Sequence, residues 1–407
     1  MFVPTRYQYT LKFVRSLVAG RMRTPLYSLC AAVIAARRAV PTYLAPLAER
    51  PVTQPHLLGA DRYTDPSRPH EEANITARHL HMHSLLPRDW KVTISERHCH
   101  PLNTVSYEQH ELRMVLLLGL QWKQAGEVGY LVDVGANCGV YSILLASLGH
   151  SCLAIDPLPT CVDEIRWGIQ RNNFKGRIRV LQRAISDRPE PIVVPETKCT
   201  PYFQLGSRQD TAEQRSARAR GIFLDGSDRR AWFGKDGRQS RTANSSASRF
   251  VDLKPLSSSK TPRITMLKID TEGHEIRVLA SAEPLLRRRI VRYMLWELTP
   301  NKWHVANTSP AAGLSLLRSL FQDSSYETVT FMEPGRRRAA CRVPGVCAER
   351  GVLTEGLKRR LPLKHFDASN LMQVFDVAAY ANATLAAGDS YAVNLLSVAV
   401  ANDAVVM

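Results

Sequence analysis

The chain has 407 residues, of which 44% are hydrophobic and 22% are charged. These values are typical of a globular protein and exclude a chain that is fibrous or disordered throughout; the length leaves room for one domain with extensions or for two domains. The formal net charge of +17 is high, but no run of five or six basic residues occurs. The charge therefore indicates a basic solvated surface rather than a nucleic-acid site.

Residues 1–50 form a basic segment with eight Lys or Arg residues and one acidic residue, Glu49. Its apolar run Leu26–Ala36 is too short to span a bilayer as a helix. A basic, acid-poor start favours targeting to an organelle, a mitochondrion or plastid, over a cytoplasmic or secretory location. The alternative is a basic arm, and contact with a membrane surface stays open. No other apolar stretch reaches about 18 residues, so no interior transmembrane helix is expected.

Residues 51–106 read as an N-terminal extension that is rich in proline and histidine. Five of its histidines lie at alternating positions: His79, His81, His83, His98 and His100. Alternating histidines can share one strand face and bind a metal, but this spacing matches no zinc-finger pattern. No metal site is therefore expected.

The main domain is predicted to span 107–407 and to start with a helix over 107–124. Leu112, Val115 and Leu116 give this helix an apolar face. Gly119 falls on the same face and weakens the prediction, because glycine inside a helix costs roughly 1 kcal/mol relative to alanine.

The segment Tyr130–Tyr141 predicts a buried strand, a tight turn and the start of a helix. Its short Val-rich stretch suits a strand covered on both faces, as in a parallel sheet. In the turn, Gly135 and Gly139 permit positive φ angles and close approach of a ligand, and Asn137 tolerates the left-handed region. The helix, from about Val140, would direct its free N–H groups at a ligand in this glycine turn.

The spacing of the glycine turn, G-x-N-x-G, differs from the G-x-G-x-x-G of dinucleotide-binding folds. Asp133 lies two residues before the first glycine. A carboxylate there suits a ligand with an ammonium group, such as the methionine part of S-adenosylmethionine. A turn that binds nothing is the alternative.

A second strand is predicted at Ser151–Pro157, and Asp156 near its end lies 21 residues after Gly135. In dinucleotide folds an acidic residue at about this distance holds the ribose diol, and a carboxylate can accept from both hydroxyls. An ordinary turn residue before proline is the alternative. The next helix is expected to carry Asp163 and Glu164 in its first turn.

A third strand over 177–187 ends with Ser186 and Asp187, at the edge where open α/β sheets bind ligands. Residues 206–262 are polar and read as a low-complexity insertion, a long loop that is at least partly disordered. A fourth buried strand, Ile264–Asp270, follows it.

Acidic residues gather directly after the fourth strand: Asp270, Glu272 and Glu275, with His274 among them. Crowded carboxylates raise one another's pKa and hold a nearby histidine more basic, which suits the removal of a proton from a hydroxyl group. Capping of a helix N-terminus is the alternative and is strongest for Glu275.

Four blocks occur in order: Asp133–Gly139, Asp156–Pro159, Ala184–Asp187 and Lys268–Glu275. This series resembles the FkbM family of S-adenosylmethionine-dependent methyltransferases over roughly 131–298. Asp156 is one departure, since the family usually has glutamate there, and the long polar stretch before the last block is another. The resemblance implies an α/β class I methyltransferase fold, which is Rossmann-like, with a mostly parallel sheet and helices on both faces. Three further strands would complete that sheet: Ile290–Leu298, Tyr326–Phe331 and Tyr391–Val400.

The resemblance and the residues together suggest how S-adenosylmethionine would be held. Asp133 and the glycine turn would bind the methionine part, and Asp156 the ribose. Ser186 or Asp187 would border the adenine.

Catalysis is assigned to Asp270, Glu272 or His274, one of which would take the proton of a hydroxyl group. The predicted activity is O-methylation of a small molecule or glycan. A non-catalytic basic binding protein on a methyltransferase scaffold is the alternative.

Eight cysteines are spread along the chain without a C-x-x-C pair. Cys138 lies inside the glycine turn, where a disulfide would be awkward. Free thiols in a reducing compartment are therefore expected.

Overall fold

The structure is a computed structural model, and the chain divides into two compact units, Met1–Ala45 and Pro46–Met407. The described residues all belong to the second unit: 70–97, 99, 101–187, 191–193, 199, 206–207, 247–251, 253, 263–321, 326–330, 357, 360–362, 373–374, 376–387 and 392–399. The predictions for segment 1–50, for His98 and for His100 lie outside them. Within the described ranges, no helix is both long and apolar enough to cross a membrane.

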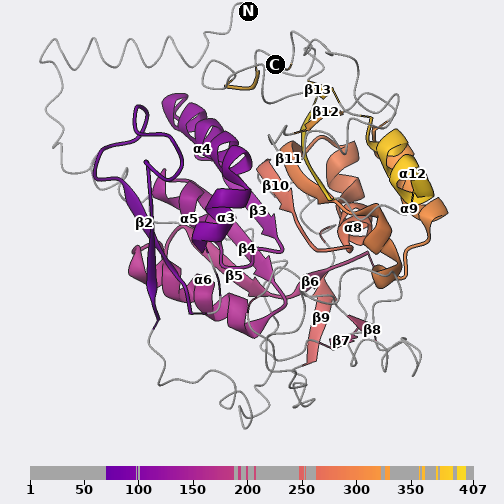
Figure 1. Cartoon of the computed structure of the whole chain (residues 1–407), viewed down its shortest axis with the longest axis horizontal. Coiled ribbons are helices and arrows are strands. Elements are labelled where there is room, and N and C mark those ends of the chain that lie inside the picture. The colour runs from indigo at the N-terminus through magenta and orange to yellow at the C-terminus, as the bar shows by residue number, and fades with distance from the viewer. Residues whose placement is uncertain are drawn as a thin grey trace, which may run out of the picture. The chain divides into compact units, whose positions relative to one another are not determined.

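A central sheet of eight strands organises the described part of the chain (Figure 1). Across the sheet the order is β13 (Gln373–Val374), β12 (Tyr326–Thr330), β14 (Val393–Ala399), β11 (Val291–Leu298), β10 (Ile264–Ile269), β3 (Tyr130–Val134), β4 (Ser151–Asp156) and β5 (Ile178–Gln182). Neighbours from β11 to β5 are parallel, whereas β14 is antiparallel to both β11 and β12. The sheet is therefore mostly parallel, as expected for a class I methyltransferase fold.

The middle strands are apolar because the sheet is covered by helices. Val132 of β3, Leu153 of β4 and Leu267 of β10 are at most 1% exposed. The purple and magenta helices of Figure 1 flank the half with β3, and the orange and yellow helices flank the half with β10 and β11. These helices are α4 (Gln109–Gln124), α5 (Val140–Ser147), α6 (Pro159–Arg171), α8 (Glu275–Arg287), α9 (Pro310–Phe321) and α12 (Val377–Ala387), with a 3₁₀-helix η5 (Pro300–Ala306) before α9.

The N-terminal extension contributes an antiparallel ribbon of β1 (Glu72–Thr76) and β2 (Lys91–Ser95), followed by α3 (Pro101–Tyr107). The ribbon is fixed to the end of α6 by Asn172. The Thr93 N–H donates to Asn172 Oδ1 over 2.9 Å, and Asn172 Nδ2 donates to the Thr93 carbonyl over 2.6 Å. This attachment brings the chain after β2 close to the glycine turn.

Two local predictions were wrong. Helix α6 starts at Pro159, whose fixed φ suits the first helical position, so its first turn contains neither Asp163 nor Glu164. The third strand ends at Gln182 instead of continuing to Asp187, because the chain then leaves the central sheet.

After Gln182 the chain forms part of a second sheet. Strand β6 (Ala184–Ile185) pairs in parallel with β9 (Ala247–Val251), and β7 (Pro191–Val193) joins β9 to β8 (Gly206–Ser207). The insertion 206–262 thus contains β8 and β9, and much of the rest of it lies outside the described residues.

Candidate active site

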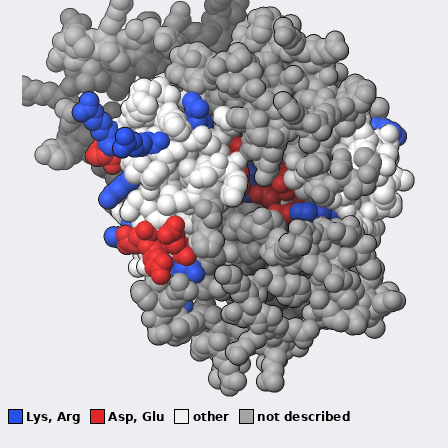
Figure 2. Space-filling model, viewed as in Figure 1, with Lys and Arg blue, Asp and Glu red and all other residues white. Residues whose placement is uncertain are grey.

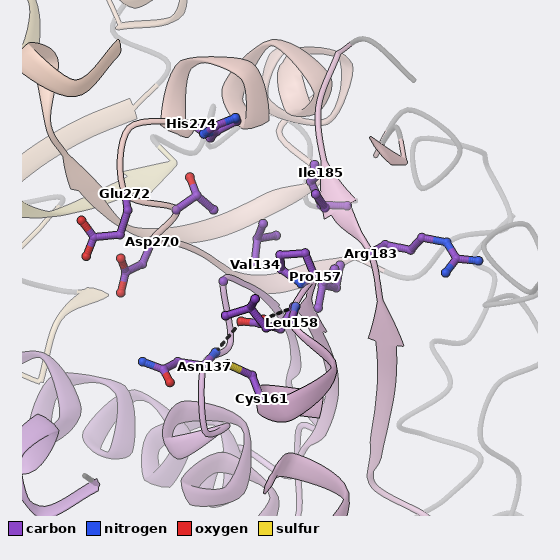
Figure 3. A pocket seen from close by; sticks show the side chains of 15 residues that line it. Val134, Asn137, Pro157, Leu158, Cys161, Arg183, Ile185, Asp270, Glu272 and His274 are labelled. Carbon is purple, nitrogen blue, oxygen red and sulfur yellow. Dashed lines mark hydrogen bonds between the residues drawn. The ribbon is translucent and has the colours of Figure 1, made fainter. Parts of the chain in front are cut away.

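A cavity of about 660 Å³, including the part open to solvent, lies at the carboxyl ends of β3, β4 and β10 (Figure 3). Ligands of open parallel α/β sheets bind at this edge. The lining comes from four short segments: 134–137 at the end of β3, 155–158 at the end of β4, 183–185 around β6 and 270–274 after β10, with Cys161 of α6. Pieces of chain more than 130 residues apart thereby face one space.

The glycine turn has the backbone that the sequence predicts. Gly135, Asn137 and Gly139 have φ angles of 75°, 52° and 76°. A Cβ on Gly135 would lie 1.8 Å from the carbonyl oxygen of Asp270, so a side chain there is excluded by the backbone after β10. Gly135 and Asn137 line the cavity, and Gly139 precedes α5. The missing side chain at Gly135 therefore allows the turn to lie directly against the backbone after β10.

Asp156 lines the cavity and is only 5% exposed. Its two carboxylate oxygens accept from the N–H groups of Asn137 and Leu158, each over 2.9 Å (Figure 3). Burial raises the pKa of Asp156 to about 7, although these two hydrogen bonds oppose the rise. Each oxygen keeps a second acceptor position, so the carboxylate fits a pair of ligand hydroxyls.

Asp133 is fully buried behind the glycine turn and is not among the residues that line the cavity. Its Oδ2 accepts from Ser142 over 2.7 Å, and its Oδ1 lies 3.7 Å from Nζ of Lys268. Lys268 also donates to the carbonyl of Gly135 over 2.9 Å and to Asp270 over 3.2 Å. Burial alone would lower the pKa of Lys268, but Asp270 and Asp133 hold it above its usual range. The Asp133–Lys268 pair therefore holds the glycine turn in place through the carbonyl of Gly135.

The acidic residues after β10 form a second wall beside the glycine turn, since the backbone of Asp270 lies against Gly135. Asp270, Glu272 and His274 all line the cavity, and the carboxylates of Asp270 and Glu272 lie near each other in Figure 3. Glu272 is paired with Lys302 of η5. Burial raises the pKa of Glu272, and Lys302 opposes that effect. Figure 2 shows acidic side chains gathered in the middle of this face of the molecule.

Glu275 has a structural position. Its two oxygens accept from the Gly273 N–H over 2.7 Å and from the Thr299 hydroxyl over 2.9 Å. It is fully buried and does not line the cavity, and its hydrogen bonds join the loop before α8 to the residue after β11. Burial raises its pKa to about 7.

Ser186 and Asp187 lie beside the cavity but not in its lining, which on that segment comes from residues 183–185. Asp187 is held by Arg277 of α8, 3.2 Å away, and accepts from Ser186 over 3.3 Å. The side chain of Arg183 points away from the cavity in Figure 3.

Sequence reasoning gave no role to two further acidic residues. Glu297, near the end of β11, has a carboxylate oxygen within 4.8 Å of those of Asp270 and Glu272, a spacing that could hold a metal ion. Burial raises its pKa well above the usual value, as do the carboxylates around it. Glu297 could have been found by the rule that located Asp270, because both lie at carboxyl ends of neighbouring parallel strands.

Glu108, just before α4, is the second. It accepts from the hydroxyl of Tyr141 over 2.6 Å, and burial followed by the charge of Asp270 raises its pKa to about 7. Nothing in the sequence near Glu108 relates it to Asp270, which lies 162 positions later in the chain.

The cysteines differ from the expected free thiols. The structure joins Cys99 to Cys138 and Cys161 to Cys199, and of the described cysteines only Cys152 is unpaired. The disulfide at Cys138 is feasible because the chain after β2 runs directly beside the turn.

Comparisons with known proteins concern the domain that holds the cavity. The structural neighbours include an O-methyltransferase from Bacillus cereus in complex with SAH (13% identity, TM-score 0.28, covering 54% of this chain and 73% of that chain). Another is the StiE O-MT fragment 961–1257 (11% identity, TM-score 0.31, covering 73% and 76%). No curated protein matches the chain. Residues 133–327 match the family model of the methyltransferase FkbM domain, so the chain carries an FkbM methyltransferase domain and is a methyltransferase.

Proposed function

We propose that this protein transfers a methyl group from S-adenosylmethionine to a hydroxyl oxygen of a small molecule or a glycan. The observation that carries the proposal is a single cavity in the FkbM domain, with a glycine turn and Asp156 on one wall and Asp270, Glu272 and His274 on the other. One wall suits a nucleoside, and the other suits removal of a proton.

The residues present fit the cofactor. Gly135 lets the backbone after β10 lie directly against the glycine turn that lines the cavity, and Asp156 has acceptor positions for two ribose hydroxyls. Asp133 acts through Lys268, which holds the carbonyl of Gly135 and so fixes the turn that binds the methionine part. The apolar side chains of Leu158 and Ile185 suit the faces of the adenine, with Ser186 and Asp187 beyond them.

When bound, S-adenosylmethionine supplies a methyl group that its sulfonium charge already activates. The protein must hold the acceptor oxygen about 3 Å from that carbon, in line with the bond that breaks, and exclude water. A carboxylate of Asp270 or Glu272, or the ring of His274, takes the hydroxyl proton as the oxygen bonds to carbon. Because this wall is acidic, it favours a neutral acceptor over an anionic one.

Calorimetric titration with S-adenosylhomocysteine tests the cofactor site. The wild type binds, and Asp156→Ala weakens binding about a hundredfold, since hydrogen bonds to a charged group contribute about 1.5–3 kcal/mol each. Asp156→Glu keeps most of the affinity because it keeps the carboxylate. The control is Asp163→Ala, which removes an exposed carboxylate of α6 and leaves the affinity unchanged. No heat from the wild type at high ligand concentration rejects the proposal.

Transfer of a labelled methyl group onto fractionated small molecules and glycans tests the reaction. Substituting the true base among Asp270→Asn, Glu272→Gln and His274→Gln lowers kcat by about 100-fold or more, with little change in S-adenosylhomocysteine affinity. A product labelled on nitrogen or carbon contradicts the O-methylation proposal.

The net charge of +17 supports one competing function, a basic binding protein without catalysis. That function predicts affinity for nucleic acid or anionic membranes that falls steeply with salt, and no methyl transfer to any acceptor. Measuring both properties on one preparation separates the two.

A further inference from the structure

Four cysteines from four separate segments meet at the glycine turn. Cys99 follows β2, Cys138 lies inside the turn, Cys161 belongs to α6, and Cys199 lies between β7 and β8. All four are at most 4% exposed. They thus connect the N-terminal extension to the glycine turn, and the segment after β7 to α6. The glycine turn and the start of α6 form the side of the cavity that is proposed to bind the cofactor, which we call the cofactor wall.

The two disulfide bonds also lie close to each other. The Sγ atoms of Cys99, Cys138 and Cys199 are all within 4.8 Å of one another, and Cys199 is bonded to Cys161. Cys161 lines the cavity itself. Asn137, another lining residue, has its Oδ1 2.8 Å from the Sγ of Cys199. Both disulfide bonds are therefore in contact with residues of the cofactor wall.

A structural zinc site is the competing explanation for clustered cysteines. Such sites usually draw on pairs of cysteines two to four residues apart, and here the bonded partners are separated by 39 and 38 positions without any short pair. The Cα atoms of the two pairs are 6.1 and 4.9 Å apart, which lies within the usual range for disulfides. The geometry favours covalent cross-links over metal binding.

We propose that the Cys99–Cys138 and Cys161–Cys199 bonds are a thiol–disulfide control site that keeps the cofactor wall in its binding conformation. Forming each bond converts two thiols into one disulfide and releases two protons and two electrons, which a disulfide oxidant such as glutathione disulfide accepts as it becomes two thiols. A dithiol such as dithiothreitol reverses the step and is oxidised to its cyclic disulfide.

The consequence for the turn follows from its backbone. The turn holds two glycines and one asparagine at positive φ, and such residues have many alternative conformations when the chain around them is released. With Cys138 free, the binding conformation becomes a smaller fraction of the population, and the apparent affinity falls by that fraction. This effect on the cofactor rests on the proposed function, whereas the cross-links and the loosening of the turn do not.

The first measurement needs no cofactor. Full-length protein is digested without reductant after free thiols are blocked, and mass spectrometry is expected to find peptides linked through Cys99–Cys138 and Cys161–Cys199. Free thiols at these positions, other pairings, or bound zinc that is released with the thiols overturn the proposal. Hydrogen exchange of the amides of residues 135–139 is expected to become at least about tenfold faster after dithiothreitol, and unchanged exchange also overturns it.

The second measurement is calorimetric titration of the same protein with S-adenosylhomocysteine. Reduction is expected to raise Kd about tenfold, and reoxidation with glutathione disulfide to restore it. Equal affinities of the two states overturn control of the cofactor wall. Absence of binding by the oxidised protein rejects the proposed function, and the hydrogen-exchange result then decides the control site by itself.

Variants identify the bond. Cys99→Ser leaves the glycine turn sequence intact and is expected to give oxidised protein the affinity of the reduced form. The matched control is Cys152→Ala, which removes the buried unpaired cysteine of β4 and should keep the full response to dithiothreitol. If Cys99→Ser does not fold, the reductant titration of the wild type still tests the proposal. If dithiothreitol still raises the Kd of Cys99→Ser about tenfold, the effect of reduction does not come from the Cys99–Cys138 bond, and the role proposed for that bond is contradicted.

Discussion

Asp156 combines burial with two backbone hydrogen bonds, and the two effects act in opposite directions on its ionisation. Burial dominates and raises its pKa to about 7. Because this folded-state pKa lies above the value of about 3.9 for an unfolded chain, folding takes up a proton. The contribution of Asp156 to stability is therefore complete below about pH 4 and is lost as the pH rises towards about 7. The ionised form is the better acceptor for a ribose, so ligand binding and the stability of the free protein prefer opposite protonation states.

The first prediction is a pH-dependent affinity for S-adenosylhomocysteine. Between about pH 8 and about pH 6 the affinity should fall about tenfold, since only about one site in ten is ionised at the lower pH. Calorimetry across this range measures it. In Asp156→Asn the binding should be weak and independent of pH. A wild-type profile that is flat contradicts the assignment of Asp156 to the ribose.

The second prediction concerns Lys268, whose ammonium group is surrounded by buried acceptors. Lys268→Met removes the charge that faces Asp133 and frees the carbonyl of Gly135. Leaving a buried carboxylate without its partner should lower the free energy of unfolding by about 3–5 kcal/mol. Chemical denaturation measures the change, with Lys175→Met on the exposed loop after α6 as the control. A loss below about 1 kcal/mol indicates that the pair does not support the turn.

At the scale of elements, the sequence was most informative where one strand is buried on both faces. β3, β4, β10 and β11 were located within one or two residues, because a covered parallel strand is a short apolar run whatever its partners are. The start of α6 was misplaced because acidic residues favour the first turn of a helix, which suggested a start near Asp163, whereas the helix begins at Pro159. β6 was missed because it pairs with β9, some 60 residues later, and local patterns carry no information about such a partner.

Gly119 lies inside a helix although glycine has a low helix propensity. It counted against a helix over 107–124, yet α4 continues through it. A Cβ there would lie 2.7 Å from the side chain of Leu145 in α5, so the glycine lets two helices approach closely. The cost to helix propensity is offset by packing that the sequence of one helix cannot reveal.

The third prediction separates two reasons for a glycine at position 135: the close approach of the Asp270 backbone and the positive φ angle. Gly135→Ala places a methyl group against the backbone carbonyl of Asp270, so strands β3 and β10 must move apart at the cavity. We expect loss of S-adenosylhomocysteine binding and a fall in unfolding free energy of more than about 3 kcal/mol. Gly126→Ala is the matched control, with a similar φ of 74° but no atom within 4 Å of the added carbon. It should cost only about 1–2 kcal/mol and keep binding. Equal effects of the two substitutions would show that φ alone matters.

At the scale of the whole molecule, the site was predictable to the extent that it follows from strand order. Asp156 and Asp270 were found because the carboxyl ends of parallel strands meet at one edge. The positions of Asp133, Ser186 and Asp187 were not, because the direction of a side chain at a strand end depends on neighbours such as Lys268 and Arg277. The convergence of the four cysteines depends on the paths of loops and of the N-terminal extension, and the pattern of apolar residues in strands does not predict those paths.

Those cysteines also join segments that lie far apart in the sequence. One disulfide ties the extension to β3 through the glycine turn, and the other ties α6 to the segment after β7. Each closes a loop of nearly 40 residues in the unfolded chain, because the bonded cysteines are 39 and 38 positions apart. Restricting the unfolded chain by a loop of this size stabilises the native state by roughly 3–4 kcal/mol per bond in the chain-entropy description.

The fourth prediction is therefore a stability that depends on redox state even without ligand. Dithiothreitol should lower the free energy of unfolding of the whole chain by several kcal/mol, a large part of the roughly 5–15 kcal/mol available to a typical protein. Denaturant unfolding with and without reductant measures the shift. Cys152→Ala should show the same shift, whereas the double variant Cys99→Ser/Cys161→Ser should start at the reduced value and not respond. Superimposable curves for oxidised and reduced wild type would mean that burial of the glycine turn, rather than cross-linking, holds the extension and the segment after β7 against the cofactor wall.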